Sequence, residues 1–316
     1  MIINDQLFFL PVFLWRATFL IVLLIEPDPI HLPAKKRYWP FVSRTSSFYH
    51  RCSQAVENSG PCLWFVLKQD ALFLVVQQDR KFIPKQQTAP IPARDIAYSR
   101  CIGVYHDLPC MVIELREQSA DHGLQPVGLR EAHAHIGEDF WAIAGRASQI
   151  VRWRTDHRFC GRCSSGMEEQ QHELLKRCPR CGFVTYPRLS PAVIMSVIKD
   201  DAILLGRAPR FPPGMYSVLA GFVEPGETLE QAVAREVKEE VDIDITDIRY
   251  IGSQPWPFPH SLMIGFTAGY AGGAIAVDHA ELEDARWFTA TDMPRLPPGF
   301  SIARRLIELY LREHSG

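Results

Sequence analysis

The segment over residues 221–243 constrains the fold of this chain more than any other stretch. Thr228 and Gln231 have the spacing of a capping box, in which two side chains satisfy backbone groups reciprocally, so we expect a helix to begin near Leu229. Four apolar residues then recur on one side of that helix, namely Leu229, Ala232, Val233 and Val237. A helix with one apolar stripe has to bury it against another layer, and we expect that layer to be a sheet.

Short apolar runs on both sides of this segment predict the strands of that sheet. They cover residues 192–198, 202–205, 217–222, 248–252 and 262–270. A second helix is predicted near the end of the sequence, over residues 302–312. Strands that surround two helices predict an α/β fold, here an α/β/α sandwich over residues 188–316.

Three glutamates of the first helix, Glu236, Glu239 and Glu240, are three and four residues apart, so their carboxylates should share one face. Such closely spaced charges repel one another, and a hard cation that prefers oxygen ligands, Mg²⁺ or Mn²⁺, would neutralise them. Glu227 lies at the helix entrance, and Arg235 is near enough to position one of the acids as a bidentate donor. The alternative is a solvated acidic face, which the run EVKEE taken alone would favour.

The spacing of the whole segment resembles the Nudix box, G-x5-E-x7-R-E-U-x-E-E-x-G-U, in which U is a bulky aliphatic residue. Eight positions match, namely Gly221, Glu227, Arg235, Glu236, Val237, Glu239, Glu240 and Ile243. Asp242 replaces the second glycine, which would end the helix in a left-handed conformation. Aspartate tolerates that conformation at a cost of about 1 kcal/mol. Because no metal ligand is lost, this departure concerns local stability more than activity.

Two close cysteine pairs precede this domain, Cys160 with Cys163 and Cys178 with Cys181. This spacing is typical of a zinc ribbon, in which four thiolates surround one structural Zn²⁺ and leave no open coordination position. Redox pairs or coincidence are the alternatives. The predicted ribbon, over residues 156–187, also carries basic residues that suggest either a nucleic-acid surface or, preferably, a solvated face. These are Arg158, Arg162, Lys176, Arg177 and Arg180.

The sequence SQPWPFPHS at residues 253–261 resembles the signature of the NADH pyrophosphatase subfamily of Nudix hydrolases. Its prolines restrict the backbone, so Trp256 and Phe258 could form rigid walls for a nicotinamide or adenine ring. A stiff loop that packs into the core is the alternative. The resemblance implies substrate-binding positions at Tyr186, Phe222, Gln254, Trp256, Phe258, Ser261 and Ala303. It also implies a homodimer, because some members of the subfamily build this site across two subunits.

The resemblance implies hydrolysis of NADH or NAD⁺ to nicotinamide mononucleotide and AMP. Glu236, Glu239, Glu240 and Glu281 would hold about two or three Mg²⁺ or Mn²⁺ ions. Glu240 and Glu281 are the candidates for general base, with Arg235 in a supporting catalytic role and Gly221 and Glu227 supporting the box. Glu283 lies close enough in sequence to compete with Glu281 for this assignment.

Two other functions are alternatives to the hydrolysis of NADH or NAD⁺. Removal of the NAD cap from RNA 5′ ends would use the same bond cleavage, with capped RNA in place of the free dinucleotide. A zinc-ribbon regulator that binds nucleic acid through a degenerate Nudix domain belongs to a different class. Since this chain retains the box glutamates, the regulator is disfavoured.

The N-terminal third carries no recognisable catalytic cluster. Apolar runs at residues 63–67, 71–76 and 111–115, followed by a helix over 132–151, predict a mixed α+β domain over residues 46–155. Residues 1–45 form a hydrophobic extension, in which the stretch 7–25 is long enough for a membrane span. Arg16 and Pro11 interrupt that stretch, which argues against such a span.

Composition adds two expectations. A net charge of −2, from 34 basic and 36 acidic residues, favours neither a nucleic-acid protein nor an acidic tail. The eight cysteines are too sparse in a chain of this length for a secreted disulfide framework, so a reducing cytoplasm is expected.

Overall fold

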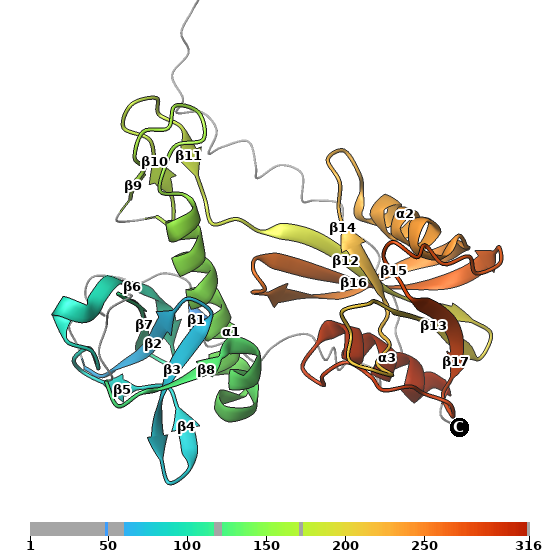
Figure 1. Ribbon diagram of the computed structural model, residues 1–316, viewed down its shortest axis with the longest axis horizontal. Coiled ribbons are helices and arrows are strands. Elements are labelled where there is room, and N and C mark those ends of the chain that lie inside the picture. The colour runs from blue at the N-terminus through green and yellow to red at the C-terminus, as the bar shows by residue number, and fades with distance from the viewer. Residues whose placement is uncertain (1–47, 50–59, 117–121, 171–172, 315–316) are drawn as a thin grey trace, which may run out of the picture. The chain divides into compact units, whose positions relative to one another are not determined.

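The computed structural model describes residues 48–49, 60–116, 122–170 and 173–314. Within these residues the strands form sheets of eight, three and six strands, which follow one another along the sequence (Figure 1). The hydrophobic stretch at residues 7–25 lies outside the described residues. None of the helices in the described part of the chain is long and apolar enough to span a membrane.

The eight-stranded sheet has the order β1-β6-β7-β2-β3-β4, with β5 paired to β2 and β8 paired to β3. Its strands are β1 (Phe48–Tyr49), β2 (Cys62–Lys68), β3 (Ala71–Gln77), β4 (Arg80–Phe82), β5 (Lys85–Gln86), β6 (Ile96–Tyr105), β7 (Leu108–Leu115) and β8 (Gln125–Gly128). Helix α1 (Leu129–Asp156) packs against them, and its residues Ala144 and Ile150 are buried in one cluster with Phe65. The helix is longer than expected and is kinked at Gly137, which has φ 76°.

The three-stranded sheet has the order β11-β10-β9, from β9 (Glu168–Glu169), β10 (Lys176–Arg177) and β11 (Val184–Thr185). Lys176 was expected on a solvated face, but it is only 4% exposed. Its Nζ donates to the carbonyl oxygens of Arg154 at 2.5 Å and His157 at 3.1 Å. These carbonyls lie at the C-terminal end of α1, where a cation is favourable, so Lys176 ties the small sheet to that helix.

The six-stranded sheet has the order β15-β16-β12-β13-β17, with β14 paired to β12. Its strands are β12 (Ser190–Lys199), β13 (Ala202–Arg207), β14 (Leu219–Phe222), β15 (Asp244–Trp256), β16 (Ser261–Gly272) and β17 (Asp284–Thr289). The β12–β16 pair is parallel, whereas the other pairs are antiparallel.

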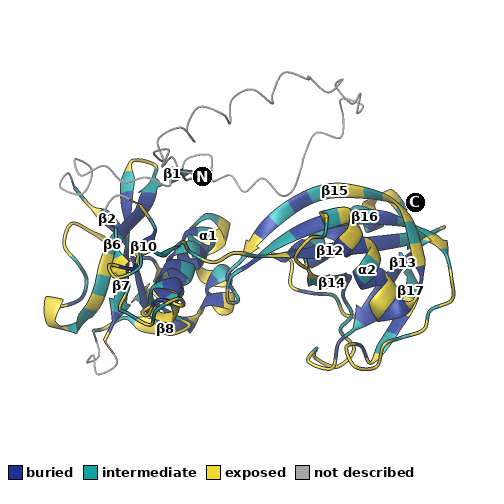
Figure 2. Ribbon diagram, turned by 90° about the horizontal axis from the view of Figure 1, so that it is seen from above, coloured by how far each residue is buried: buried dark blue, intermediate teal, exposed yellow. Residues whose placement is uncertain are grey.

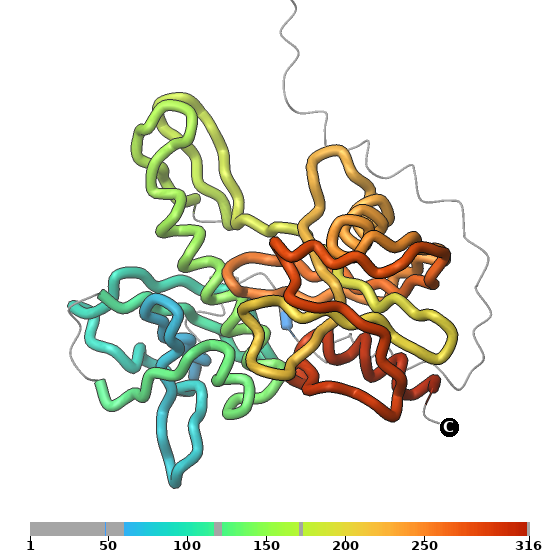
Figure 3. The backbone as a smooth tube through the Cα atoms, turned by 45° about the vertical axis from the view of Figure 1, so that its right-hand side comes forward, coloured from blue at the N-terminus to red at the C-terminus, as the bar shows by residue number. Residues whose placement is uncertain are grey.

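Helices α2 (Leu229–Val241) and α3 (Ile302–His314) cover opposite faces of this sheet (Figure 1). The central strand β12 shows why, because its side chains alternate between two cores. Val193 and Met195 are buried with α2, whereas Ile194 is buried with α3. Most of β12 is dark blue in Figure 2, as expected for a strand buried on both sides, and Figure 3 traces the backbone of the loop that joins β14 to α2. The sandwich expected from the sequence is confirmed.

The signature at residues 253–261 is a β-hairpin, whereas the predicted strands, over residues 248–252 and 262–270, placed it in a loop between them. Its first half is the end of β15, where Pro255 pairs with Leu262, and Ser261 begins β16. Because β15 is the edge strand of its sheet, the missing N–H of Pro255 does not break a ladder on an inner strand.

Cys101 on β6 is disulfide-bonded, whereas Cys62 and Cys110 are buried cysteines outside any disulfide. This disulfide argues against the reducing cytoplasm expected from the cysteine content, because a reducing compartment does not favour such a bond.

Candidate functional site

Helix α2 is fixed at both ends by the contacts expected from its sequence. The Thr228 hydroxyl accepts from the Gln231 N–H at 3.2 Å, and the Gln231 side chain accepts from the Thr228 N–H at 2.8 Å, which confirms the capping box. At the other end Asp242 has φ 56°, as expected for the residue that replaces glycine. Lys238 lies 2.9 Å from the Asp242 carboxylate and 3.2 Å from that of Asp244. The hydrogen bonds to Asp242 and Asp244 raise the pKa of Lys238.

Arg235 is the centre of an ion-pair network at the entrance of the helix. Its guanidinium binds both oxygens of Glu227, at 2.5 and 2.8 Å, and donates to the Phe222 carbonyl at 2.9 Å. It also donates to Glu236 at 2.9 Å and to Glu239 at 2.8 Å. The hydrogen bonds from Arg235 lower the pKa of Glu227 to about 2. Glu227 therefore holds Arg235, which in turn positions the loop and two of the box glutamates.

Glu236 and Glu240 are buried carboxylates, 8% and 6% exposed. Within the described part of the chain, Oε2 of Glu240 is buried and has no hydrogen-bond partner. Burial, followed by the charges of Glu236 and Glu281, raises the pKa of Glu240 to about 8. Burial also raises the pKa of Glu236. A buried carboxylate oxygen without a donor fits a divalent cation, since the cation would supply the missing partner.

Gly221 is required by the close approach of β14 to α2. A Cβ atom at this position would lie 1.7 Å from the carboxyl carbon of Glu236 and 1.9 Å from one of its oxygens. Any other residue would displace that carboxylate. The first glycine of the box therefore makes room for an acid of the same box.

The remaining acids differ in their surroundings. Glu239 is exposed and turns toward Arg235. Glu281 is also exposed, and its charge contributes to the raised pKa values of Glu236 and Glu240. Glu283, the competitor for its role, forms an ion pair with Arg207 at 2.8 Å. This geometry favours Glu281 as the additional acid of the cluster.

A cavity of about 290 Å³ opens beside Glu240. Trp256 and Ala303 line it, as do Ile194 of β12, Met263 of β16 and Ser301. Its wall therefore combines one acid of the box with one aromatic residue of the signature, in a space bordered by the sheet and by α3. An apolar pocket with a few polar groups is the usual form of a small-molecule site.

The other expected substrate residues lie elsewhere. The Gln254 side chain donates to the Phe300 carbonyl and accepts from the Ile302 N–H, both at 2.8 Å, so it fixes the start of α3. Ser261 is buried at the start of β16. Phe258 does not line the cavity beside Glu240, and the guanidinium of Arg130 stacks 3.7 Å from its ring centroid.

Phe222 and Tyr186 are exposed aromatic residues. Their exposed fractions, 59% and 62%, are high for large apolar side chains. Neither residue lines the cavity beside Glu240.

Arg207 and Arg210, at the end of β13 and in the loop after it, were not singled out from the sequence. Arg207 pairs with Glu283, and Arg210 lines the cavity beside Glu240. The only sequence signal was the position of two arginines in the run GRAPRFPPG, directly before the strand that leads into the box.

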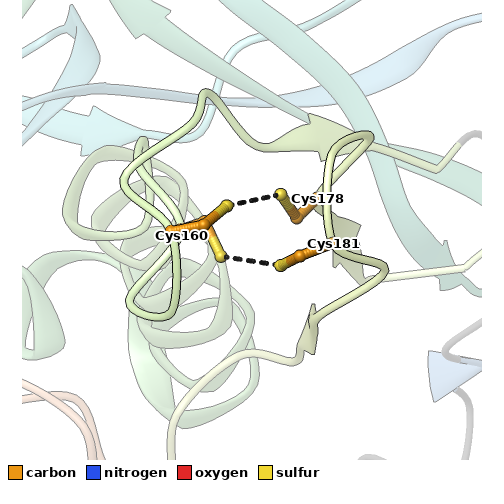
Figure 4. A group of neighbouring side chains, drawn as sticks. Cys160, Cys178 and Cys181 are labelled. Carbon is orange, nitrogen blue, oxygen red and sulfur yellow. Dashed lines mark hydrogen bonds between the residues drawn. The ribbon is translucent and has the colours of Figure 1, made fainter.

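The four cysteines form a second site. Among the described residues, they are the one group of three or more His, Cys, Asp and Glu side chains whose ligand atoms lie within 4.8 Å of one another. Cys160 Sγ is 3.6 Å from that of Cys181, and Cys163 Sγ is 3.4 Å from that of Cys178. Figure 4 shows the labelled cysteines pointing toward a common centre. Four sulfur ligands in this arrangement could bind Zn²⁺ and would leave no open position for chemistry.

The two parts of the chain match two family models. Residues 188–310 match the NUDIX domain, and residues 61–153 match the NADH pyrophosphatase-like rudimentary NUDIX domain. The sequence had left the N-terminal domain unidentified, because its apolar runs carry none of the spaced acids that mark the C-terminal one.

Two curated relatives are both named NAD-capped RNA hydrolase NudC. The one from Pseudomonas aeruginosa (strain LESB58) is 49% identical over 215 residues, which cover 68% of this chain and 77% of that protein. The one from Stutzerimonas stutzeri (strain A1501) is 50% identical over 215 residues, which cover 68% and 78%. A crystal structure of a NUDIX hydrolase from Nitrosomonas europaea covers 50% of this chain and 92% of its own, with a TM-score of 0.44 and 22% identity.

Proposed function

The chain belongs to the Nudix hydrolase family, and we propose that it hydrolyses the pyrophosphate bond of NADH and NAD⁺. The products are reduced or oxidised nicotinamide mononucleotide and AMP. One observation carries the proposal: Glu240, whose carboxylate oxygen Oε2 is buried without a partner, lines a cavity that the signature residue Trp256 also lines. A site for a cation and a wall for an aromatic ring thus border the same space.

Different residues of the chain bind the metal, accept the proton and position the glutamates. Glu236 and Glu240 hold Mg²⁺ or Mn²⁺, and Glu239 and Glu281 extend the site from its exposed side. When bound, the metal neutralises the pyrophosphate and lowers the pKa of a bound water. A water oxygen bonds to one phosphorus as the bridging phosphorus–oxygen bond breaks, and Glu240 or Glu281 takes the water proton. Arg235 keeps the glutamates in place.

Trp256 and Ala303 shape the cavity for one ring of the dinucleotide, and stacking on Trp256 contributes about 1–3 kcal/mol. Gln254, Ser261 and Phe258 act behind that wall, since each is packed against other parts of the protein. Their role is to hold Trp256 and the start of α3 in position.

The cysteine cluster holds one structural Zn²⁺. Support comes from the four sulfur atoms within 4.8 Å of one another and from the exclusively sulfur donor set, which suits zinc better than Mg²⁺.

Removal of the NAD cap from RNA is a second candidate substrate reaction for the same site. The name of the Pseudomonas and Stutzerimonas relatives, NAD-capped RNA hydrolase, supports it. The exposed arginines of the ribbon region, Arg158, Arg162, Arg177 and Arg180, offer charge for an RNA backbone. A zinc-ribbon regulator without catalysis is disfavoured, because the buried box glutamates would then be retained at a cost with no gain.

We also propose a homodimer. Phe222 and Tyr186 are large apolar side chains with more than half of their surface exposed, and a second copy of the chain would cover them. Sedimentation equilibrium should give twice the chain mass of 36.0 kDa. A monomer at micromolar concentration would contradict the dimer without affecting the proposed reaction.

The experiment compares initial rates on NADH and on an NAD-capped RNA, for the wild type and for Glu240→Gln. We expect the wild type to cleave both substrates and the variant to lose about 10²–10⁴-fold in turnover on each, with its fold and zinc content unchanged. Near-normal turnover of Glu240→Gln would refute the role of Glu240. A wild type that cleaves neither substrate would refute the proposed function.

A further inference from the structure

The loop between β13 and β14 is held from inside by Arg207. Its guanidinium donates to the carbonyl oxygens of Pro212 at 2.7 Å, and of Phe211 and Met215 at 3.3 Å each. Its Nε lies 2.8 Å from the carboxylate of Glu283. Three backbone carbonyls of one loop are thereby tied to a side chain that is itself fixed, so the loop keeps one conformation.

The same loop is also held from outside. The Arg295 N–H donates to the Gly214 carbonyl at 3.1 Å, and the Tyr216 N–H donates to the Arg295 carbonyl at 3.0 Å. Gly214 has φ 72°, a conformation that glycine adopts without strain. Arg210 belongs to the same loop and directly precedes Phe211, the first residue whose carbonyl Arg207 binds.

Arg210 differs from its neighbour in having no carboxylate partner. In the part of the chain that the structure describes, no acid lies within 4.0 Å of its guanidinium nitrogens, and Arg210 Cζ lies 5.6 Å from the centroid of the Phe211 ring. It nevertheless lines the cavity that Glu240 and Trp256 line. Arg130, the other arginine of that cavity, is already stacked on Phe258.

The charge balance of the cavity explains what such an arginine could do. Glu236, Glu240 and Glu281 carry negative charge around the part of the cavity that Glu240 lines, and a bound pyrophosphate would add more. Cations held by the glutamates would neutralise part of it. The planar fork of an arginine matches two oxygens of one phosphate group, which a metal-bound glutamate cannot do.

We propose that Arg210 is a phosphate-binding residue of the active site, presented to the pyrophosphate by the loop that Arg207 and Glu283 hold. This inference rests on the proposed function for the identity of the substrate, but phosphate binding can be measured without that substrate. Because Arg210 binds the phosphate while Arg207 shapes the loop, the two arginines should respond differently to substitution.

The test is a calorimetric titration of inorganic pyrophosphate in Mg²⁺ into the wild type, Arg210→Gln, Arg210→Lys and Arg249→Gln. Arg249 is a matched control, because it is an exposed arginine of β15 outside the cavity and without an ion pair among the described residues. We expect Arg210→Gln to weaken pyrophosphate binding about 10- to 100-fold, Arg210→Lys to weaken it less, and Arg249→Gln to bind like the wild type. Thermal unfolding of Arg210→Gln should match that of the wild type.

Hydrolysis of NADH by the same proteins separates the two proposals. A wild type that binds pyrophosphate but does not cleave NADH would refute the proposed function and leave the role of Arg210 standing. Equal pyrophosphate affinity of Arg210→Gln and the wild type, or no pyrophosphate binding by the wild type, would overturn the role of Arg210. A loss of affinity in Arg249→Gln as large as that in Arg210→Gln would also overturn it.

Discussion

At the scale of single residues, the site rests on two carboxylates that are buried and one arginine that is shared. Arg235 neutralises Glu227 and contacts Glu236 and Glu239, but it makes no hydrogen bond to Glu240. Glu240 is therefore the acid whose charge the protein itself leaves least compensated, apart from the more distant Arg210. An uncompensated buried charge destabilises the fold until a ligand neutralises it.

The pH dependence of stability should report this charge. The folded pKa of Glu240, about 8, lies above its ordinary value of 4.5, so the folded state binds the proton more tightly than the unfolded state. The stability linked to that proton is complete below pH 4.5 and is lost as the pH rises through 8. As the pH rises from 4.5 to 8, the metal-free wild type should therefore lose stability that Glu240→Gln keeps. The difference between their free energies of unfolding should grow to a few kcal/mol in order of magnitude.

Urea unfolding of both proteins at a series of pH values measures the difference directly. Subtracting one curve from the other cancels the remaining titratable groups. Mg²⁺ at pH 8 should stabilise the wild type and leave Glu240→Gln nearly unchanged. A difference between the proteins that stays constant with pH would contradict the assignment.

Most of the residues of the candidate site could be identified from spacing, but their environments could not. Spacing along a helix places Glu236, Glu239 and Glu240 on one side. It does not say that Glu239 turns out to Arg235 while Glu240 turns into the core, because neighbouring β-strands decide that. The sequence does not predict the role of Arg210 for a similar reason. The position of its loop depends on the ion pair of Arg207 with Glu283, which is far away in the sequence.

At the scale of elements, helix α2 follows from local signals at both of its ends. The capping box starts it at Leu229, and Asp242 ends it in the left-handed region. The hairpin at residues 253–261 was harder to foresee, since its prolines suggested a loop and only the edge position of β15 makes Pro255 acceptable in a strand. The kink of α1 at Gly137 has no counterpart in the predicted apolar pattern.

The C-terminal end of α2 offers a test of local stability. Asp242→Gly should relieve about 1 kcal/mol of left-handed strain. It also removes the ion pair with Lys238, which is weak because both side chains are exposed and water screens their charges. We expect a net gain of about 0.5 kcal/mol in the free energy of unfolding, with hydrolysis unchanged.

Urea denaturation measures this gain, and Asp242→Asn serves as the control because asparagine also tolerates the left-handed region. A loss of stability in Asp242→Gly would show that the Lys238 contacts outweigh the backbone strain. A large fall in hydrolysis would show that Asp242 belongs to the active site.

At the scale of the whole molecule, the described chain joins a rudimentary domain, a cysteine-paired module and a catalytic domain in sequence. Lys176 anchors the module to the end of α1 through two backbone carbonyls. The catalytic domain reaches α1 as well, since Trp256 and Phe300 contact Trp141. Metal in the cysteine cluster should therefore matter for stability more than for the chemical step.

Replacement of one cysteine of the cluster tests this separation. Cys178→Ser should lower the zinc content from about one ion per chain to near zero and lower the melting temperature by several degrees. Cys62→Ser, which changes a buried thiol outside the cluster, should keep the zinc. Plasma mass spectrometry gives the zinc content, and full retention of zinc in Cys178→Ser would contradict the assignment of the cluster.

The central claim is that the acids around Glu240 use a divalent cation to cut the pyrophosphate of a nicotinamide dinucleotide. Chromatography of the products formed from NADH, with Mg²⁺ or Mn²⁺ and then with chelator added, tests it most directly. We expect equal amounts of reduced nicotinamide mononucleotide and AMP with metal, and intact NADH once the metal is removed. Release of free nicotinamide with ADP-ribose, or turnover that is unaffected by chelator, would contradict it.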